Sequence, residues 1–251
     1  MDRLTPAPGA NPLGGPVVHL DLTGSTNDRA RALATAGAPH GTLVLAEEQT
    51  AGRGRQGRIW VAPRGRALTL SLVVRAGGTA LELLPLSTAV AVCETCERVA
   101  GVPSAVKWPN DVWIDERKVA GILIEARPQE RWAVVGIGLN VDTTEDELDP
   151  EIRATATSFR IAAGAEASRS RALEALLERL SSWLGADRDP LLSAYRERDA
   201  LYGRGIAWIT GDERLEGEAK GIDGNGNLVV FTADGERHTL ASGEVHLLAG
   251  P

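Results

Sequence analysis

Three arginines on a glycine-rich segment are the first residues whose types and spacing suggest chemistry. Residues 52–57 read Gly-Arg-Gly-Arg-Gln-Gly, with arginines at 53 and 55, and Arg58 follows directly. A guanidinium can hold phosphate or carboxylate through two parallel hydrogen bonds, and glycines let the backbone adapt to the anion. The segment therefore indicates an anion-binding loop. A solvated loop whose charges serve solubility is the other interpretation.

The same six residues match the dinucleotide-binding pattern G-x-G-x-x-G. That interpretation requires a helix directly after the last glycine and an acidic residue about 20 positions further on. Residues 59–62 and 67–75 are instead strand-like, and positions 72–75 carry no acid. A Rossmann-type dinucleotide site is therefore disfavoured.

A second group of unlike side chains occupies residues 107–111, which read Lys-Trp-Pro-Asn-Asp. Magnesium commonly takes one or two protein carboxylates beside substrate phosphates, so Asp111 is a candidate ligand for this ion. Asn and Asp are also common turn formers, and an Asx-type turn is the alternative. Lys118 follows seven residues after Asp111, and on its own it would be interpreted as a turn lysine that faces solvent.

Two glycines, Gly136 and Gly138, interrupt a strand-like run over residues 131–141. Glycines inside a strand weaken it and often mark a place where a ligand approaches the backbone closely. Asn140 would then be within reach of a base or a ribose. A β-bulge is the other explanation for the two glycines.

The elements that must position these loops follow from the apolar pattern. Period-two and continuous apolar runs predict strands at 17–22, 42–47, 59–62, 67–75, 112–115, 119–126 and 131–141, with a hairpin turn at 116–118. Helical spacing and capping residues predict helices from about Ser25 to Gly37 and at 83–100, 169–184 and 190–201. This mixture predicts an α+β fold in which helices flank a mixed β-sheet.

The pattern changes at Gly203. From there to Leu248 we count five short strands, which are separated by turn signals rich in Gly, Asp and Asn. Turns at this spacing predict a small SH3-like β-barrel. We therefore expect a flexible tail over 1–16, a larger domain over 17–202 and a C-terminal domain over 203–251.

Composition limits the classes of protein that the sequence allows. The chain has 251 residues with 27 Lys and Arg against 34 Asp and Glu, and the net charge of −7 argues weakly against nucleic acid as the main partner. No apolar run is long enough to span a bilayer, and no signal core precedes residue 17. Cys93 and Cys96 fall in a predicted helix with no further metal ligand nearby, so we interpret them as packing residues of a cytoplasmic protein.

Taken in order, five segments resemble the biotin protein ligase family. They are Ser-Thr-Asn at 25–27, the run from Glu48 to Trp60, Lys-Trp-Pro-Asn-Asp at 107–111, the run from Arg117 to Leu123, and the run from Gly136 to Val141. Each segment is weak evidence by itself, but their shared order and spacing are specific. The resemblance covers residues 17–141 tightly, and the expected barrel looks like the C-terminal domain of the family.

This resemblance implies a class II synthetase-like catalytic domain over 17–202. It also implies that the protein joins biotin and ATP to form biotinyl-5′-AMP, with Mg²⁺, and then transfers biotin to one lysine of a carrier domain. The partner would be the biotin carboxyl carrier domain of a biotin-dependent carboxylase. The biotin carboxylate and the α-phosphate are both anionic, so cations are needed to lower their repulsion.

By matching motif positions, the resemblance also implies roles for individual residues. Lys118, Arg53 and Arg55 would be catalytic. The biotin site would comprise Ser25, Thr26, Asn27, Gln49, Arg53, Gly54, Arg55 and Lys118. The ATP site would comprise Trp60, Lys107, Asn110 and Asn140, and Asp111 would hold the metal.

Some members of the family carry an N-terminal DNA-binding domain, and about 16 residues before the first predicted strand are too few for one. We therefore expect no direct DNA binding, no membrane association, and a monomer or weak homodimer. A lipoate or octanoate ligase is the closest alternative enzyme. A biotin or nucleotide sensor without turnover, and a structural adaptor, are the non-enzymatic alternatives.

Overall fold

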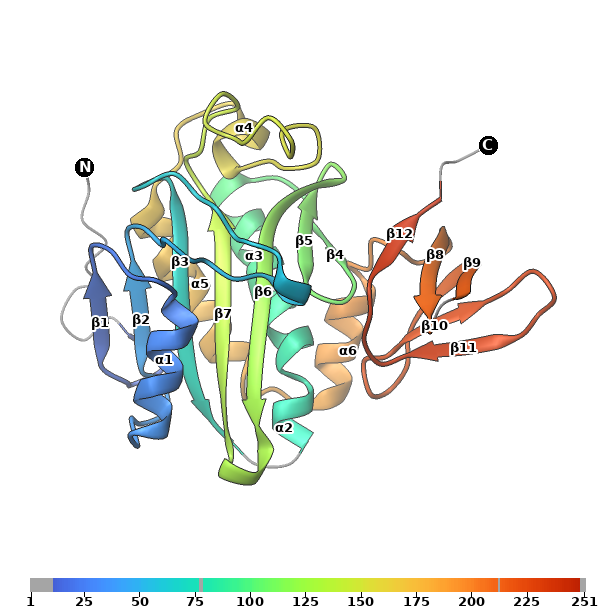
Figure 1. Ribbon diagram of the computed structural model, residues 1–251, viewed down its shortest axis with the longest axis horizontal. Coiled ribbons are helices and arrows are strands. Elements are labelled where there is room, and N and C mark those ends of the chain that lie inside the picture. The colour runs from blue at the N-terminus through green and yellow to red at the C-terminus, as the bar shows by residue number, and fades with distance from the viewer. Residues whose placement is uncertain (1–10, 77–78, 212, 249–251) are drawn as a thin grey trace.

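Two β-sheets, with helices packed against the larger one, form the part of the chain that the structure describes (Figure 1). The structure is a computed structural model that describes residues 11–76, 79–211 and 213–248. Ten residues of the expected tail, 1–10, lie outside these ranges. Within the tail's described part, the Asn11 side-chain amide donates to the carbonyls of Gly15 and Gly41, both at 2.8 Å.

The larger sheet has seven strands in the order β1-β2-β3-β7-β6-β5-β4. β1 and β2 run parallel, and every other neighbouring pair is antiparallel. β2 is buried along its whole length, as is β3 at eight of its nine residues, because helices or loops cover both faces. The strands are β1 (Val17–Leu20), β2 (Leu43–Ala46), β3 (Ala67–Arg75), β4 (Ala105–Lys107), β5 (Asp111–Ile114), β6 (Arg117–Arg127) and β7 (Trp132–Asn140).

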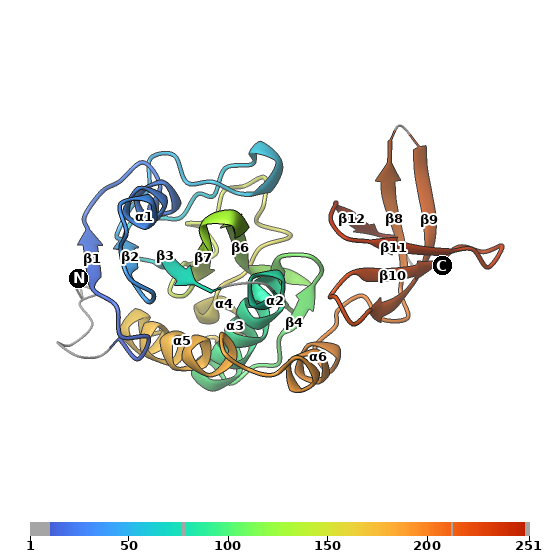
Figure 2. The same ribbon diagram turned by 90° about the horizontal axis from the view of Figure 1, so that it is seen from below.

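Helices lie on both faces of this sheet (Figure 2). On one face, α1 (Thr26–Thr35) packs Ala30 and Ala34 against valines of β2, β3 and β7. The other face is covered by α3 (Leu84–Ala100), α5 (Arg169–Trp183) and α6 (Arg188–Arg196), and α2 (Thr79–Glu82) and α4 (Phe159–Ala163) are short. None of the helices in the described ranges is both long and apolar enough to cross a membrane.

Cys93 and Cys96 lie on α3 and are fully buried with free thiols. Burial raises the pKa of Cys93 to about 12 and raises that of Cys96 well above its ordinary value. Both thiols therefore stay neutral and pack as small apolar groups.

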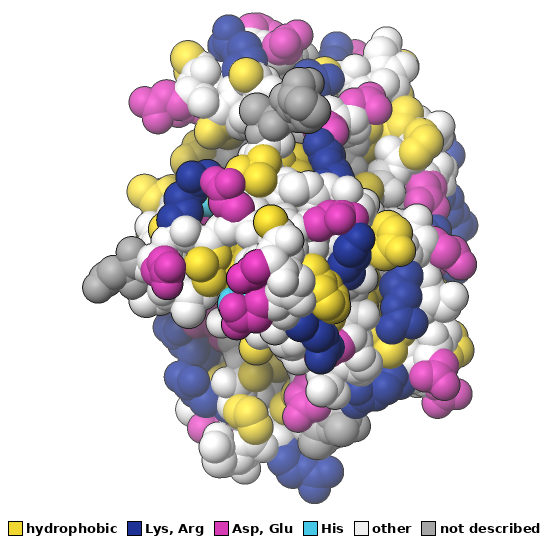
Figure 3. All heavy atoms as spheres, turned by 90° about the vertical axis from the view of Figure 1, so that its right-hand side faces the viewer, with side chains coloured by type: hydrophobic (Ala, Val, Ile, Leu, Met, Phe, Trp, Pro, Cys, Tyr) yellow, Lys and Arg dark blue, Asp and Glu magenta, His cyan; other side chains and the backbone are white. Residues whose placement is uncertain are grey.

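The second sheet has five antiparallel strands in the order β11-β10-β9-β8-β12. Its apolar residues, including Trp208 and Val230, belong to the same core cluster as the larger domain, and Trp108 donates an indole hydrogen bond to the Gly226 carbonyl at 3.1 Å. On the face seen in Figure 3, side chains of both charges are interspersed with separate hydrophobic areas. The strands are β8 (Gly205–Thr210), β9 (Glu213–Ile222), β10 (Leu228–Phe231), β11 (Arg237–Leu240) and β12 (Val245–Leu247).

The predicted α+β class and the mixed sheet are confirmed, and three details differ. Residues 59–62 do not form the predicted strand, and Ile59 makes only an isolated bridge to Arg53. The hairpin turn comprises Asp115 and Glu116, whose φ values of 48° and 59° suit a two-residue turn. The helix expected at 190–201 begins at Arg188 and ends at Arg196, before a segment that pairs with β4.

Candidate active site

A cavity of about 770 Å³ opens beside α1 on one face of the larger sheet. It is lined by residues of β6 and β7, by the glycine-rich segment, and by residues 243–245 at the start of β12 in the C-terminal sheet. Alternate residues of a strand face the same side, so Gly136, Gly138 and Asn140 of β7 all face the cavity. Every residue that the sequence analysis assigned to a site lines this cavity: Ser25, Thr26, Asn27, Gln49, Arg53, Gly54, Arg55, Trp60, Lys107, Asn110, Asp111, Lys118 and Asn140.

The glycines of the floor allow other groups to lie directly on the sheet. A Cβ atom at Gly136 would be 2.1 Å from Asn27 Oδ1, and one at Gly138 would be 2.3 Å from Cε2 of Trp60. The pairing of β7 with β3 and β6 runs through both glycines without a register shift. The bulge explanation is therefore wrong, and the glycines serve close approach.

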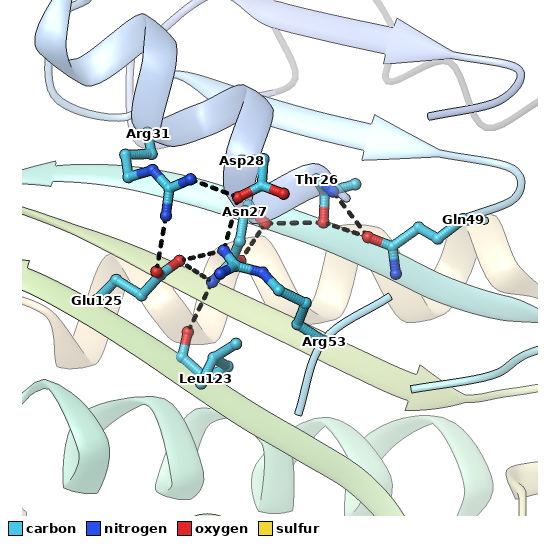
Figure 4. Close-up of polar contacts among 9 residues, drawn as sticks. Thr26, Asn27, Asp28, Arg31, Gln49, Arg53, Leu123 and Glu125 are labelled. Atoms are coloured by element: carbon cyan, nitrogen blue, oxygen red, sulfur yellow. Dashed lines mark hydrogen bonds and ion pairs between the residues drawn. The ribbon is translucent and has the colours of Figure 1, made fainter. Parts of the chain in front are cut away.

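One end of the cavity is polar and buried, where α1 begins (Figure 4). The backbone N–H and the hydroxyl of Thr26 both donate to Gln49 Oε1, at 2.7 and 3.0 Å. Ser71 Oγ lies 2.8 Å from Thr26 Oγ1 and 2.6 Å from Asn27 Oδ1, while Asn27 Nδ2 donates to the Leu123 carbonyl at 3.3 Å. These groups hold one another in fixed orientations, as a site for an uncharged polar ligand requires.

Arg53 fastens the glycine-rich segment to the rest of this end (Figure 4). Its Nη2 atom lies 2.8 Å from Asp28 Oδ1 and 2.8 Å from Glu125 Oε2. Arg31 pairs with the same two carboxylates, at 2.6 and 3.1 Å. The charge of Arg53 is thus compensated by the carboxylates of Asp28 on α1 and Glu125 on β6. The sequence analysis missed Asp28, Arg31 and Glu125, because only the packing of α1 on the sheet brings them to the arginine.

The opposite end of the cavity is charged. Lys118 Nζ lies 2.7 Å from Asp111 Oδ1 and 5.9 Å from the centre of the Trp60 ring. Arg55 donates to Asn110 Oδ1 at 3.0 Å, and Asn110 Nδ2 donates to Asp111 Oδ1 at 2.9 Å. The motif at 107–111, the lysine on β6 and the arginine of the glycine-rich segment therefore converge in one place.

Burial affects two of the cations at this end. Desolvation lowers the pKa of Arg55 against the opposing influence of Asp111 and Glu244. Desolvation likewise lowers the pKa of Lys107, with the same two carboxylates opposing it, and Lys107 Nζ lies 5.4 Å from the centre of the Trp113 ring. Partly desolvated cations interact more strongly with an incoming anion than exposed ones do.

Two walls of the cavity were not predicted. Arg58 forms an ion pair with Glu244, and Glu244 comes from the loop before β12 in the C-terminal sheet. A segment that follows β7 forms the other wall through Glu147, Leu148, Asp149, Ile152, Thr155 and Ala156. Ser71 was also missed, although a serine within the apolar run of β3 was a signal that could have identified it.

Asp111 is the carboxylate that the sequence analysis assigned to a metal ion, and its Oδ1 atom accepts from Lys118 and from Asn110. Within the described ranges, no group of three or more His, Cys, Asp or Glu side chains could hold one. A single carboxylate beside substrate phosphates is nevertheless a usual environment for Mg²⁺. The donor set therefore fits an ion that arrives with a nucleotide.

The cavity has one end where charged side chains pair with one another around polar groups, and another where Arg55, Lys107 and Lys118 converge. This arrangement suits a ligand that joins a neutral head group to an anionic centre. Residues 20–142 match the model of the Biotin/lipoate A/B protein ligase family, and residues 202–248 match that of the Biotin protein ligase C terminal domain. These two matches define the chain as a biotin/lipoate-type protein ligase.

Relatives specify the class further. The chain is 35% identical over 233 residues to the biotin–[acetyl-CoA-carboxylase] ligase of Mycobacterium tuberculosis, covering 89% of this chain and 85% of the relative. It is 35% identical over 238 residues to the ligase of the same name from Paracoccus denitrificans, covering 90% and 98%. The structure of the biotin protein ligase from Aquifex aeolicus in complex with biotin and ATP superposes with a TM-score of 0.79 at 28% identity, covering 93% and 99%. This chain therefore belongs to the biotin protein ligase family, as its motifs predicted.

Proposed function

We propose that this protein activates biotin with ATP and transfers it to one lysine of a biotin carboxyl carrier domain. In the first step, a carboxylate oxygen of biotin attacks the α-phosphorus of ATP and pyrophosphate leaves. In the second step, the lysine amine of the carrier attacks the acyl carbon of biotinyl-5′-AMP, and AMP leaves. No covalent bond to the enzyme is needed.

The observation that carries this proposal is the convergence of Arg55, Lys107 and Lys118 at one end of the glycine-floored cavity. Two anionic reactants repel one another, and fixed cations stabilise the charge that develops between them. Lys118 would donate to the biotin carboxylate and afterwards to the acyl phosphate.

The other sequence-assigned residues keep their proposed roles. The ureido head of biotin would bind at the polar end, where its buried polar atoms find partners. Trp60 would pack on the adenine side, and Lys107, Asn110 and Asn140 would bind ATP. A magnesium ion, held by Asp111 when the nucleotide is bound, would neutralise phosphate charge. The proposed biotin site as a whole comprises Ser25, Thr26, Asn27, Gln49, Arg53, Gly54, Arg55 and Lys118.

We assign Arg53 and Arg55 different roles in the reaction. Because Arg53 is paired with Asp28 and Glu125, it would act by holding the loop over biotin. Arg55 reaches the Asn110 side chain and would interact with the phosphate region directly.

A defined reaction tests the proposal. The protein is incubated with ATP, Mg²⁺, biotin and a carrier domain, and mass spectrometry should find biotin on one carrier lysine. Lipoate in place of biotin is the control, because the matching family model covers both types of ligase. Modification with lipoate alone would refute the choice of substrate, and no modification with either acid would refute ligase activity.

A cytoplasmic location accords with the free thiols of Cys93 and Cys96. The expected lack of direct DNA binding, and the expected monomer or weak homodimer, stay predictions from the sequence.

A further inference from the structure

The wall segment that follows β7, residues 142–157, is held at both of its ends by contacts to other parts of the chain. At its C-terminal end the contacts are backbone hydrogen bonds to β6: Lys118 N–H donates to the Thr155 carbonyl at 2.7 Å, and Thr157 N–H donates to the Lys118 carbonyl at 2.9 Å. No substitution of a side chain removes these bonds directly. This end of the segment is therefore fixed by the sheet.

At its N-terminal end the Asp142 N–H donates to the Arg66 carbonyl at 2.8 Å, and Asp142 Oδ1 accepts from Arg160 and from the Ala167 N–H, both at 3.1 Å. The Arg66 side chain adds two ion pairs, and it is the group that also reaches Glu147 inside the segment. Arg66 Nη1 lies 2.8 Å from Asp142 Oδ2, and Arg66 Nε lies 2.9 Å from Glu147 Oε1. The second oxygen of Glu147 accepts the backbone N–H of Thr144 at 2.9 Å, so the carboxylate also shapes the turn inside the segment. A planar guanidinium can bridge two carboxylates in this way, whereas a lysine ammonium is a single point charge.

The Glu147 carboxylate is stabilised in its charged form by its partners. Burial acts to raise the pKa of Glu147, but hydrogen bonds from Thr144 and Arg66 outweigh it and lower that pKa. Glu147 lines the cavity, where an anionic nucleotide is expected. Pairing with Arg66 thus compensates a carboxylate that would otherwise repel the nucleotide.

The register of β7 shows which end of the cavity the segment covers. Gly136 lies against Asn27 at the polar end, Gly138 lies under Trp60, and Asn140 follows two residues later. Asn140 Nδ2 donates to the Thr157 carbonyl at 3.0 Å. The segment therefore covers the end that holds Asn140 and Lys118, away from the proposed ureido site.

We propose that Arg66 is a positioning residue that holds residues 142–157 over the nucleotide end of the cavity through its two ion pairs with Asp142 and Glu147. This inference rests on the proposed function for its kinetic consequence. Arg66 does not line the cavity, and it acts by keeping the wall in place and the Glu147 carboxylate paired.

The test compares Arg66→Ala with Arg66→Lys and with the control Arg64→Ala. Arg64 lies two residues away in the sequence and pairs with Asp21 and Glu48, outside the segment. In biotin-dependent exchange of pyrophosphate into ATP, Arg66→Ala should raise the KM for ATP about tenfold or more, the equivalent of about 1.4 kcal/mol. The affinity for biotin measured without ATP should stay unchanged, Arg66→Lys should recover part of the loss, and Arg64→Ala should behave as the wild type.

Hydrogen exchange on the ligand-free protein gives a readout that does not depend on activity. Amides in residues 142–152 should exchange faster in Arg66→Ala than in the wild type, while amides in β3 and β7 stay as slow as before. Three results would each overturn the role of Arg66: unchanged amide exchange in residues 142–152, an unchanged KM for ATP, or a loss of biotin affinity as large as the change in the KM for ATP. If the wild type shows no exchange of pyrophosphate at all, the proposed function fails, and amide exchange still decides whether Arg66 holds the segment.

Discussion

Replacing Gly136 by alanine adds one methyl group at the most crowded point of the polar end. Its Cβ would lie 2.1 Å from Asn27 Oδ1 and 2.8 Å from Asn27 Cγ. β7 cannot move away easily, because Gly136 is paired with Ser71 of β3 on one side and with Leu123 of β6 on the other. The Asn27 side chain must therefore move.

The cost follows from the contacts that Asn27 would lose. They are the bonds with Ser71 at 2.6 Å, with Glu125 at 3.0 Å and with the Leu123 carbonyl at 3.3 Å. At about 1 kcal/mol for each hydrogen bond, the free energy of unfolding should fall by about 2–3 kcal/mol. For a chain of this size that corresponds to a fall in Tm of roughly 4–12 °C. If the displaced Asn27 side chain loses its proposed contact with biotin, the affinity for biotin should fall about tenfold.

Thermal unfolding and calorimetry with biotin measure both effects. Gly185→Ala is the matched control, since a Cβ there meets no atom within 4 Å. The double variant Asn27→Ala, Gly136→Ala should be as stable as Asn27→Ala within about 0.5 kcal/mol, because removing Asn27 removes the clash. Strict additivity of the two costs, or a Gly136→Ala protein with unchanged Tm and biotin affinity, would refute this reasoning.

Three further predictions concern the charged end. Lys118→Ala should slow biotin-dependent exchange of pyrophosphate into ATP by a factor on the order of 10²–10³, as for other preorganised donors, and a near-normal rate would exclude Lys118 from the mechanism. Arg55→Gly removes the hydrogen bond that joins the glycine-rich segment to Asn110, so biotinyl-5′-AMP should escape from the cavity. The escaped intermediate should label lysines of a bystander protein, which a blot detects. Labelling no greater than with the wild type would contradict this. Burial lowers the pKa of Lys107 from 10.5, so its ammonium loses its charge at a lower pH than an ordinary lysine does. As the pH is raised, kcat/KM for ATP should therefore begin to fall before pH 10.5 is reached. Lys107→Arg should move the fall to higher pH, and an identical pH profile would argue against a role for this charge.

Local patterns in the sequence were sufficient for the elements and for most of the site. Alternating or continuous apolar residues identify β3 and β7, because this periodicity acts within a few residues. The polar residues before Ala30 identify the start of α1, although the Ser25 side chain makes no capping hydrogen bond there. The glycines at 136 and 138 indicated close approach for the same reason, since a missing side chain is visible without knowledge of its neighbours.

Contacts between distant segments were not available from such patterns. Arg53 meets Glu125 across 72 positions, and Arg58 meets Glu244 across 186. Residues 59–62 have strand-like composition, yet they form no strand because they cross the cavity instead of joining the sheet.

The sequence by itself determined the class of the fold, the glycine floor, and the arginines and lysines that the structure brings to the cavity. Only the tertiary structure decided that Arg53 is bound to two carboxylates, that Arg66 holds residues 142–157, and that the C-terminal sheet contributes a wall. Residue type and spacing specify what a side chain can bind and which face of its own element it occupies. Its partners depend on sheet register and helix packing, which are set by many weak contacts along the whole chain.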